Sequence, residues 1–200
     1  MKLIKLSFAF LLLILVGCAT IPMDAVPDQA IQKPSANQSQ VVFMRSSFIG
    51  SAIAATLYEV RDNKTEFIGI LNNGTKIALK TTPGKHLYMV VSEVADFMEA
   101  DLSPGKTHYS MITPRMGAWK ARFSMWPIST NPSAEFNTSS DDFQEWLSET
   151  SLVTMSESAL AWYQQNKASV EQKRVKYWPK WQQKTPEDKA KRTLVPSDGL

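Results

Sequence analysis

The chain has 200 residues, of which 44% are hydrophobic, so it suits one packed domain with an appendage and excludes an intrinsically disordered protein. The formal net charge is +3, but it is unevenly placed: residues 18–166 carry 11 basic and 15 acidic residues, whereas residues 167–200 carry 9 basic and 4 acidic residues. The chain is therefore a mildly acidic body with a basic tail. This asymmetry is modest, and a solvated helical face explains it about as well as an anionic partner does.

The first 17 residues predict a signal peptide. Lys2 and Lys5 make the start positive, and an unbroken apolar run follows from Phe8 to Val16. As a helix this run would span roughly 14 Å, about half of the hydrocarbon core of a membrane, which is too short for a transmembrane anchor. A positive start, a short apolar stretch and small residues before a cleavage site are typical of a signal peptide.

The segment Leu15-Val16-Gly17-Cys18 resembles the lipobox of bacterial lipoproteins. The resemblance implies that a diacylglyceryl group is attached to the sulfur of Cys18 and that cleavage leaves this cysteine as the first residue. Cys18 is the single cysteine of the sequence, so an internal disulfide is excluded, and the alternatives are an ordinary secretory signal or a buried free thiol. By resemblance to Gram-negative sorting rules, Ala19 implies the outer membrane rather than retention at the inner one.

Residues 18–39 predict a lipidated N-terminus followed by a flexible tether. Pro22, Pro27 and Pro34 punctuate a polar stretch without a sustained apolar period. Such a segment is expected to be extended and semi-flexible, and it would reach roughly 60 Å at about 3.1 Å per residue.

Residues 40–128 predict a small antiparallel β-sandwich of seven or eight strands, because short stretches rich in β-forming residues recur there at intervals of 8–12 residues. An Asn73-Gly74 pair between two of them is a strong hairpin signal. The expected strands are 41–44, 53–60, 67–71, 76–79, 86–92, 97–102, 107–113 and 119–125.

Four motifs in this region resemble a family of small bacterial lipoproteins that is similar to PEGA-type β-sandwiches. They are Val41-Val42-Phe43-Met44-Arg45, the Ile-Gly-Ile-Leu stretch at 68–71, Thr82-Pro83-Gly84-Lys85-His86, and residues 102–109 with a second Pro-Gly-Lys turn. The resemblance implies a sandwich fold and a surface setting. It carries over no catalytic residue.

Residues 129–200 predict a helical C-terminal extension. Residues 139–142 offer a helix cap, and Met155, Ala159, Tyr163 and Val170 fall on one face of a helix that Pro179 is expected to limit. Thr185-Pro186 is typical of a second cap, and residues 189–200 are expected to be frayed.

We predict no catalytic residue, no metal and no cofactor besides the covalent lipid. Ser103-Pro104-Gly105-Lys106 matches a Ser-x-x-Lys pattern, but Pro-Gly indicates a turn and not the helix start that this chemistry needs. The two histidines, His86 and His108, are expected at strand ends on a wet surface, and Asp141-Asp142 is interpreted as a pair of helix-capping acids.

The tail offers the best candidate partner-binding residues, because it mixes cations with large rings. They are Lys173, Arg174, Lys176, Tyr177, Trp178, Lys180 and Trp181. Three interpretations stay open: the rings pack on the sandwich, lie at a membrane interface beside anionic head groups, or form a hot spot for an envelope protein or a cell-wall partner. Export makes a nucleic-acid partner a poor interpretation.

These observations together predict a lipid-anchored envelope protein of the outer membrane, facing the periplasm or the cell surface. We expect it to be a non-enzymatic binding or scaffolding module. The alternative is a cell-wall-active hydrolase or accessory factor that uses carboxylates assembled by the fold.

Overall fold

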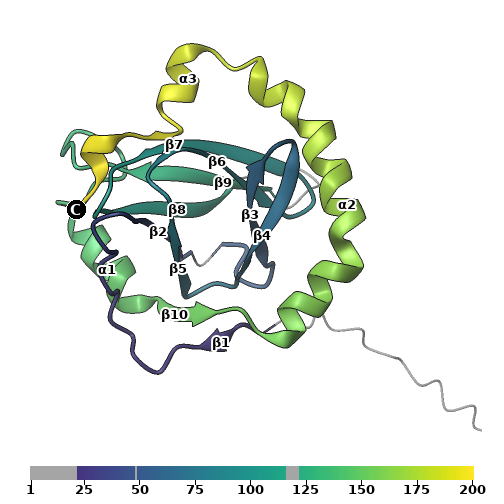
Figure 1. Ribbon diagram of the computed structural model, residues 1–200, viewed down its shortest axis with the longest axis horizontal. Coiled ribbons are helices and arrows are strands. Elements are labelled where there is room, and N and C mark those ends of the chain that lie inside the picture. Colours follow the sequence, from purple (N-terminus) through teal and green to yellow (C-terminus); the bar gives the residue numbers. More distant parts are fainter. Residues whose placement is uncertain (1–21, 48, 116–121) are drawn as a thin grey trace, which may run out of the picture.

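The computed structural model describes residues 22–47, 49–115 and 122–200, so Cys18, Ala19 and the predicted signal peptide lie outside the described residues. The described chain forms two β-sheets packed face to face, with a long helix near the C-terminus (Figure 1). The prediction of a mainly β sandwich with a C-terminal helix is confirmed.

The first sheet has six strands in the order β1-β10-β5-β2-β8-β9. Their bounds are β1 (Asp24–Ala25), β2 (Ser39–Arg45), β5 (Thr75–Thr81), β8 (Thr107–Arg115), β9 (Arg122–Ile128) and β10 (Ser151–Thr154). β2 pairs with β8 in parallel, as β5 does with β10, and the other neighbours are antiparallel.

The second sheet has five strands in the order β11-β7-β6-β3-β4. Their bounds are β3 (Ala55–Arg61), β4 (Lys64–Leu71), β6 (Gly84–Val91), β7 (Ala95–Leu102) and β11 (Thr193–Leu194). β11 lies parallel to β7. The expectation of seven or eight antiparallel strands was therefore wrong in detail: both sheets are mixed, and three short strands come from segments outside residues 40–128.

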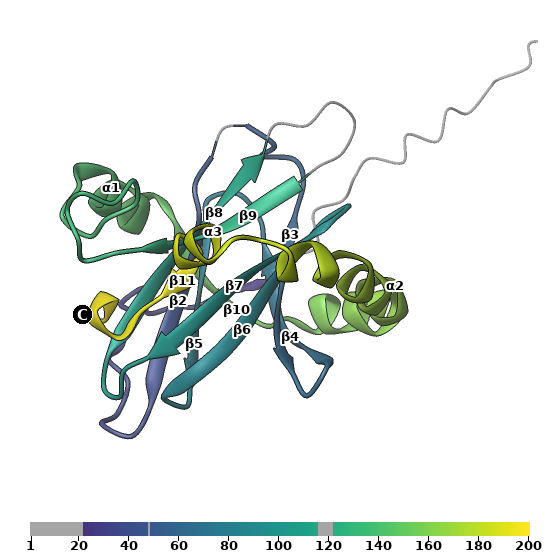
Figure 2. The same cartoon turned by 90° about the horizontal axis from the view of Figure 1, so that it is seen from above.

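The core follows from the alternation of side chains along the strands. On β2, Val41 and Phe43 point between the sheets, whereas Val42 and Met44 point outward and pack with Phe143 of α1 (Asp141–Glu149). The outer face of the second sheet packs against α2 (Glu157–Gln182). Figure 2 shows the resulting four layers, with one helix on each side of the two sheets.

Local signals set where the helices begin. Ser140 is the N-cap of α1 and accepts a hydrogen bond from the Phe143 N–H, which confirms the predicted cap. Thr185 caps α3 (Pro186–Ala190) in the same way, as expected. Pro179, by contrast, lies inside α2 instead of ending it. Proline removes a single hydrogen bond, the one to the Val175 carbonyl, and the burial of Trp181 keeps the last turn in place.

From Pro22 onward, the segment that was expected to be a flexible tether is bound to the folded body. β1 pairs with β10, the Leu152 N–H donates to Gln29 Oε1 at 2.6 Å, and the Gly105 N–H donates to the Gln38 carbonyl at 2.7 Å. Backbone groups of a polar, proline-containing stretch thus find partners on the edge of the first sheet. Residues 22–38 belong to the folded body.

The last residues are ordered and not frayed. After α3 they form β11 and a 3-10 turn, η1 (Pro196–Asp198). Leu194 is fully buried between the sheets, and Leu200 and Thr107 exchange backbone hydrogen bonds of 3.0 and 3.1 Å. The region 129–200 is therefore part of the sandwich and not a separate helical extension. Among the described residues no helix is long and apolar enough to span a bilayer.

Candidate anion-binding site

A basic pocket of about 440 Å³ lies between the C-terminal half of α2 and the edge of the sandwich where β7 meets the β8–β9 hairpin. Five cationic side chains line it, namely Arg115, Arg122, Lys176, Lys180 and Lys184. One carboxylate, that of Asp96, lines it with them. The pocket is therefore strongly positive in a chain whose net charge is small.

Three of the cations come from one face of the helix. Lys176, Lys180 and Lys184 are spaced by four residues, so they stack along α2 and its end, where like charges repel one another. All three ammonium groups lie near aromatic rings: the Nζ atoms of Lys176 and Lys180 are 5.8 and 5.4 Å from the centroid of Tyr177, and that of Lys184 is 5.9 Å from the centroid of Trp181. Within the part of the chain that the structure describes, none of the three lysines has a carboxylate within 4.0 Å.

The other two cations face each other across a β-ladder. Arg115, the last residue of β8, pairs in register with Arg122, the first residue of β9. Like charges directly opposite on antiparallel strands are destabilising, so this pair breaks a local rule of sheet stability. Such violations are expected at functional sites, where binding compensates for the local cost.

Asp96 does not neutralise the pocket, because its charge is already compensated. Its buried carboxylate accepts a hydrogen bond from Arg192 at 2.9 Å and lies 3.6 Å from Arg115. Arg192 is held in turn by the Met125 carbonyl, to which it donates at 2.9 Å, and by the ring of Trp126, whose centroid is 3.6 Å from Cζ. The remaining positive charge of the pocket is left open to a ligand.

The structure gives the predicted tail residues three kinds of surroundings, and Trp181 shares two of them. Trp178 and Trp181 pack on Phe97 of β7, with centroid distances of 5.2 and 6.1 Å, and Trp181 is fully buried. Lys176, Tyr177, Lys180 and Trp181 line the pocket. Lys173 and Arg174 are engaged elsewhere, with the Ser92 carbonyl and with Glu171.

Sequence reasoning missed Arg115, Arg122, Lys184, Asp96 and Arg192. Only Lys184 lies near the basic run that drew attention to the tail. The two arginines of the hairpin reach the pocket through strand pairing between distant segments, for which the sequence shows no local signal.

A second cavity, of about 700 Å³, is a polar groove with mixed charges. At its centre Glu59 forms hydrogen bonds of 2.8 Å with His86 Nδ1 and with Arg61. Burial alone would raise the pKa of Glu59, but the hydrogen bonds from His86 and Arg61 outweigh it and lower that pKa. The hydrogen bond to Glu59 raises the pKa of His86 against the opposing effect of burial. The pair thus favours a charged imidazolium–carboxylate contact.

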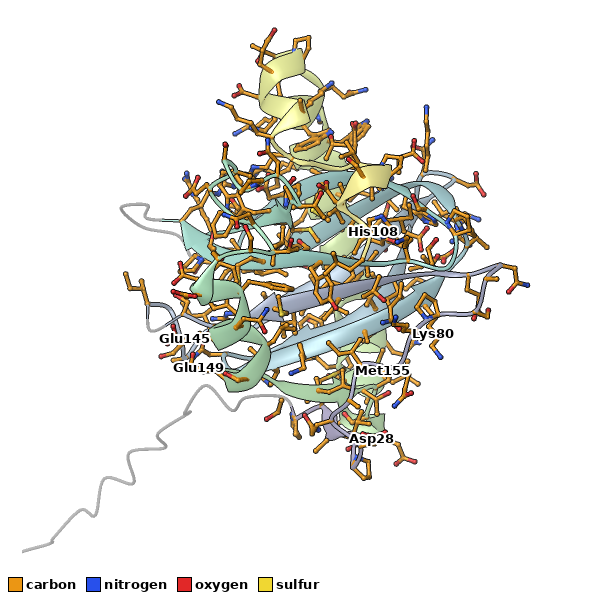
Figure 3. The ribbon with its side chains drawn as sticks, turned by 90° about the vertical axis from the view of Figure 1, so that its left-hand side faces the viewer. Asp28, Lys80, His108, Glu145, Glu149 and Met155 are labelled. Atoms are coloured by element: carbon orange, nitrogen blue, oxygen red, sulfur yellow. The ribbon has the colours of Figure 1, made fainter. Side chains whose placement is uncertain are left out.

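The histidines do not lie on a wet surface as expected. His108 is fully buried, because its side of β8 also carries Ser110 and Ile112 and points between the sheets. Figure 3 shows His108 beside the C-terminal segment, and a Cβ atom added to Gly199 would lie only 3.0 Å from its Nε2. The ring of His86 is also nearly covered, with 4% exposed. Within the described ranges no cluster of three metal-ligating side chains occurs.

Comparisons with protein-family models, with curated proteins and with solved structures gave no match. The function therefore has to be inferred from the side chains themselves. The feature with the clearest chemistry is the basic pocket.

Proposed function

We propose that this protein is a lipid-anchored, non-enzymatic binding module of the bacterial cell envelope, and that it binds an anionic ligand in its basic pocket. One observation carries the proposal: among the described residues, Arg122, Lys176, Lys180 and Lys184 surround a concave site without a carboxylate partner. The lipobox around Cys18 supports the anchor, and Ala19 supports placement at the outer membrane. The resemblance to PEGA-type lipoprotein domains stays a prediction.

The chemistry of the pocket favours an oxyanion. Arginine presents a planar fork of N–H donors that matches phosphate and carboxylate, and lysine adds compact point charges. A cleft lined by one sign of charge also focuses the field and raises the local concentration of counter-ions. The two arginines at one wall and the three lysines at the other suit a ligand with more than one negative group.

The hydrolase alternative has one feature in its favour, the carboxylates of the polar groove. The most buried of them, Glu59, is held as a carboxylate by His86 and Arg61, which leaves it poorly suited to donate a proton. If the groove were catalytic, Glu59→Gln would abolish cell-wall hydrolysis by the purified protein. We expect the purified, unsubstituted protein to show no cell-wall hydrolysis, so that Glu59→Gln has no activity to abolish.

The pocket is tested by calorimetric titration with inorganic pyrophosphate at low ionic strength. The protein used begins at residue 18 and carries Cys18→Ser, so that it keeps every described residue without the lipid. We expect Lys176→Gln/Lys180→Gln/Lys184→Gln to weaken binding at least about tenfold, because each lost charge-assisted hydrogen bond contributes on the order of 1.5–3 kcal/mol. Lys167→Gln, an exposed lysine on the same helix outside the pocket, is the matched control. Equal affinity of the triple variant and the unsubstituted protein for pyrophosphate would disprove anion binding in the pocket.

The anchor is tested separately in cells. Cys18→Ser should abolish metabolic labelling with palmitate and should make the protein removable from membranes by a high-salt wash, since the acyl chains that provide stable anchoring are lost. The intact mass of the mature protein provides the second readout. An unmodified mass, or a first residue other than Cys18, would refute lipidation.

A further inference from the structure

Pro22 is fixed to the start of α2. Ser156, the N-cap of the helix, donates through Oγ to the Pro22 carbonyl at 2.6 Å, and Ser158 donates to the same oxygen at 3.2 Å. Three residues separate Pro22 from Cys18, so even a fully extended chain spans only about 14 Å between them. A lipid on Cys18 would therefore hold the folded body at the membrane surface.

One end of the sandwich, here called the loop end, contains the ends of several paired strands and the connections between them. The paired positions Arg45 with Thr75, Ala55 with Leu71, Val91 with Ala95, and Arg115 with Arg122 all lie there. The described parts of the connections between these strand ends include residues 46–47, 49–54, 72–74 and 92–94. Figure 2 shows the ends of β8, β9 and β3 reaching this side of the molecule.

The loop end presents exposed aliphatic side chains next to cations. Ile49 and Ile53 are 57% and 42% exposed in the segment 46–54. This segment contacts the β8–β9 hairpin, because a Cβ atom built on Gly50 would lie 3.6 Å from the side chain of Pro114, the residue before Arg115. Exposed isoleucines on a segment that contacts the strand carrying Arg115 give a composition suited to the head-group region of a membrane.

The charge at this end is predominantly positive. The basic pocket opens beside it, because Val94 of the turn 92–94 and both hairpin arginines line that pocket. Two acidic residues oppose this charge at the same end: Glu149, which accepts a hydrogen bond from the neutral hydroxyl of Ser46, and Glu93, which acts electrostatically on Lys173. Basic groups close to a bilayer are attracted to anionic lipids within a Debye length of the surface.

We propose that the loop end docks on the anionic membrane that carries the anchor, and that the ligand of the basic pocket is a phosphate group of a lipid in that membrane. This inference rests on the proposed function, since it identifies the anion. Ile49 and Ile53 enter the interface, and Arg115 and Arg122 hold the phosphate. Asp24 pairs with Thr154, three residues along β10 from Ser151, and Ser151 lies beside Thr75 of the loop end, so the start of the described chain is roughly 10 Å from this end along the strand.

The test is co-sedimentation of the unlipidated Cys18→Ser protein with vesicles. We expect binding to vesicles of phosphatidylcholine and phosphatidylglycerol in equal parts, no binding to phosphatidylcholine alone, and loss of binding as salt is raised. Arg115→Gln/Arg122→Gln should weaken both vesicle and pyrophosphate binding about tenfold. Ile49→Ser/Ile53→Ser should weaken vesicle binding to a similar extent and leave pyrophosphate binding unchanged.

The matched control for the isoleucines is Val195→Ser, an aliphatic residue 40% exposed beside the polar groove, which should bind vesicles normally. Thermal unfolding establishes that each variant is folded. If pyrophosphate binds in the pocket but anionic vesicles do not bind, the membrane inference fails and the proposed function stands. If neither binds, both fail. Equal binding to the two kinds of vesicle would also overturn the inference.

Discussion

Arg192 and Asp96 form a buried ion pair in the corner where β7 and β9 meet, with 2.9 Å between Nη1 and Oδ2. Their side chains are 7% and 6% exposed. Because Arg192 also donates to the Met125 carbonyl and to Ser124 Oγ, it joins the second sheet to the first. The C-terminal segment is thus fastened across the open edge of the sandwich.

Replacing Arg192 by Gln should destabilise the protein by about 3 kcal/mol, because it leaves the buried Asp96 carboxylate with only the longer 3.6 Å contact to Arg115. Urea unfolding measures the change. The neighbouring Lys191 is exposed, so Lys191→Gln should change the free energy of unfolding by less than about 0.5 kcal/mol. A loss of less than about 1 kcal/mol for Arg192→Gln would contradict this description of the corner.

Truncation after Lys191 should prevent cooperative folding. The deletion removes Leu194 from the core between the sheets, and it removes Asp198, whose carboxylate accepts hydrogen bonds from Ser129 Oγ and the Val195 N–H. We expect no sharp thermal transition by circular dichroism for the truncated chain. Leu194→Ala in the full chain tests the same contact more gently and should cost about 2–5 kcal/mol. A truncated protein that unfolds cooperatively would show that the C-terminal segment is dispensable.

The local features of the fold were predictable from the sequence, because each depends on neighbouring residues. Ser140 and Thr185 cap helices, and Asn73-Gly74 makes a tight turn with a positive φ at Gly74, through hydrogen bonds and backbone angles within a few positions. The hairpin expected at that turn was wrong, because the turn leads from β4 in the second sheet to β5 in the first. β10 and β11 were not predictable. Each is a short strand paired with a distant segment, such as Ser151 with Thr75, so the partner and not the local sequence decides its structure.

The candidate site shows the same division. The basic run on α2 drew attention to Lys176 and Lys180, but the sequence does not show that Arg115 and Arg122 come to lie beside them. His108 was misplaced for a related reason. A histidine beside a turn usually meets water, but its face of β8 points between the sheets and the C-terminal segment packs beside it.

Ser156→Ala should lower the free energy of unfolding by about 1 kcal/mol. The substitution removes the N-cap hydrogen bond to the Ala159 N–H, and it removes one of the two hydroxyl groups that hold the Pro22 carbonyl. Ser158→Ala removes the longer contact with Pro22 and the hydroxyl–hydroxyl contact with Ser156 but leaves the N-cap hydrogen bond in place, so it is the control. Chemical unfolding of the two variants gives the comparison, and an equal effect of both would mean that the cap contributes nothing.

His86 and His108 should titrate on opposite sides of the ordinary histidine pKa of 6.5, which NMR titration of the ring protons resolves directly. The hydrogen bond to Glu59 raises the pKa of His86, whereas burial lowers that of His108 against the opposing charge of Asp198. Because the pKa of His86 is raised on folding, its contribution to stability is complete below pH 6.5. That contribution is lost as the pH rises through the pKa of His86 in the folded protein.

The lowered pKa of His108 acts in the other direction. The unfolded chain protonates His108 more readily than the folded protein does. The stability that neutral His108 contributes is therefore complete above pH 6.5 and is lost as the pH falls toward the pKa of His108 in the folded protein. Glu59→Gln should lower the pKa of His86 and leave that of His108 unchanged, because the carboxylate contacts only the first ring. Two coincident titrations near pH 6.5 would contradict both the ion pair and the buried imidazole.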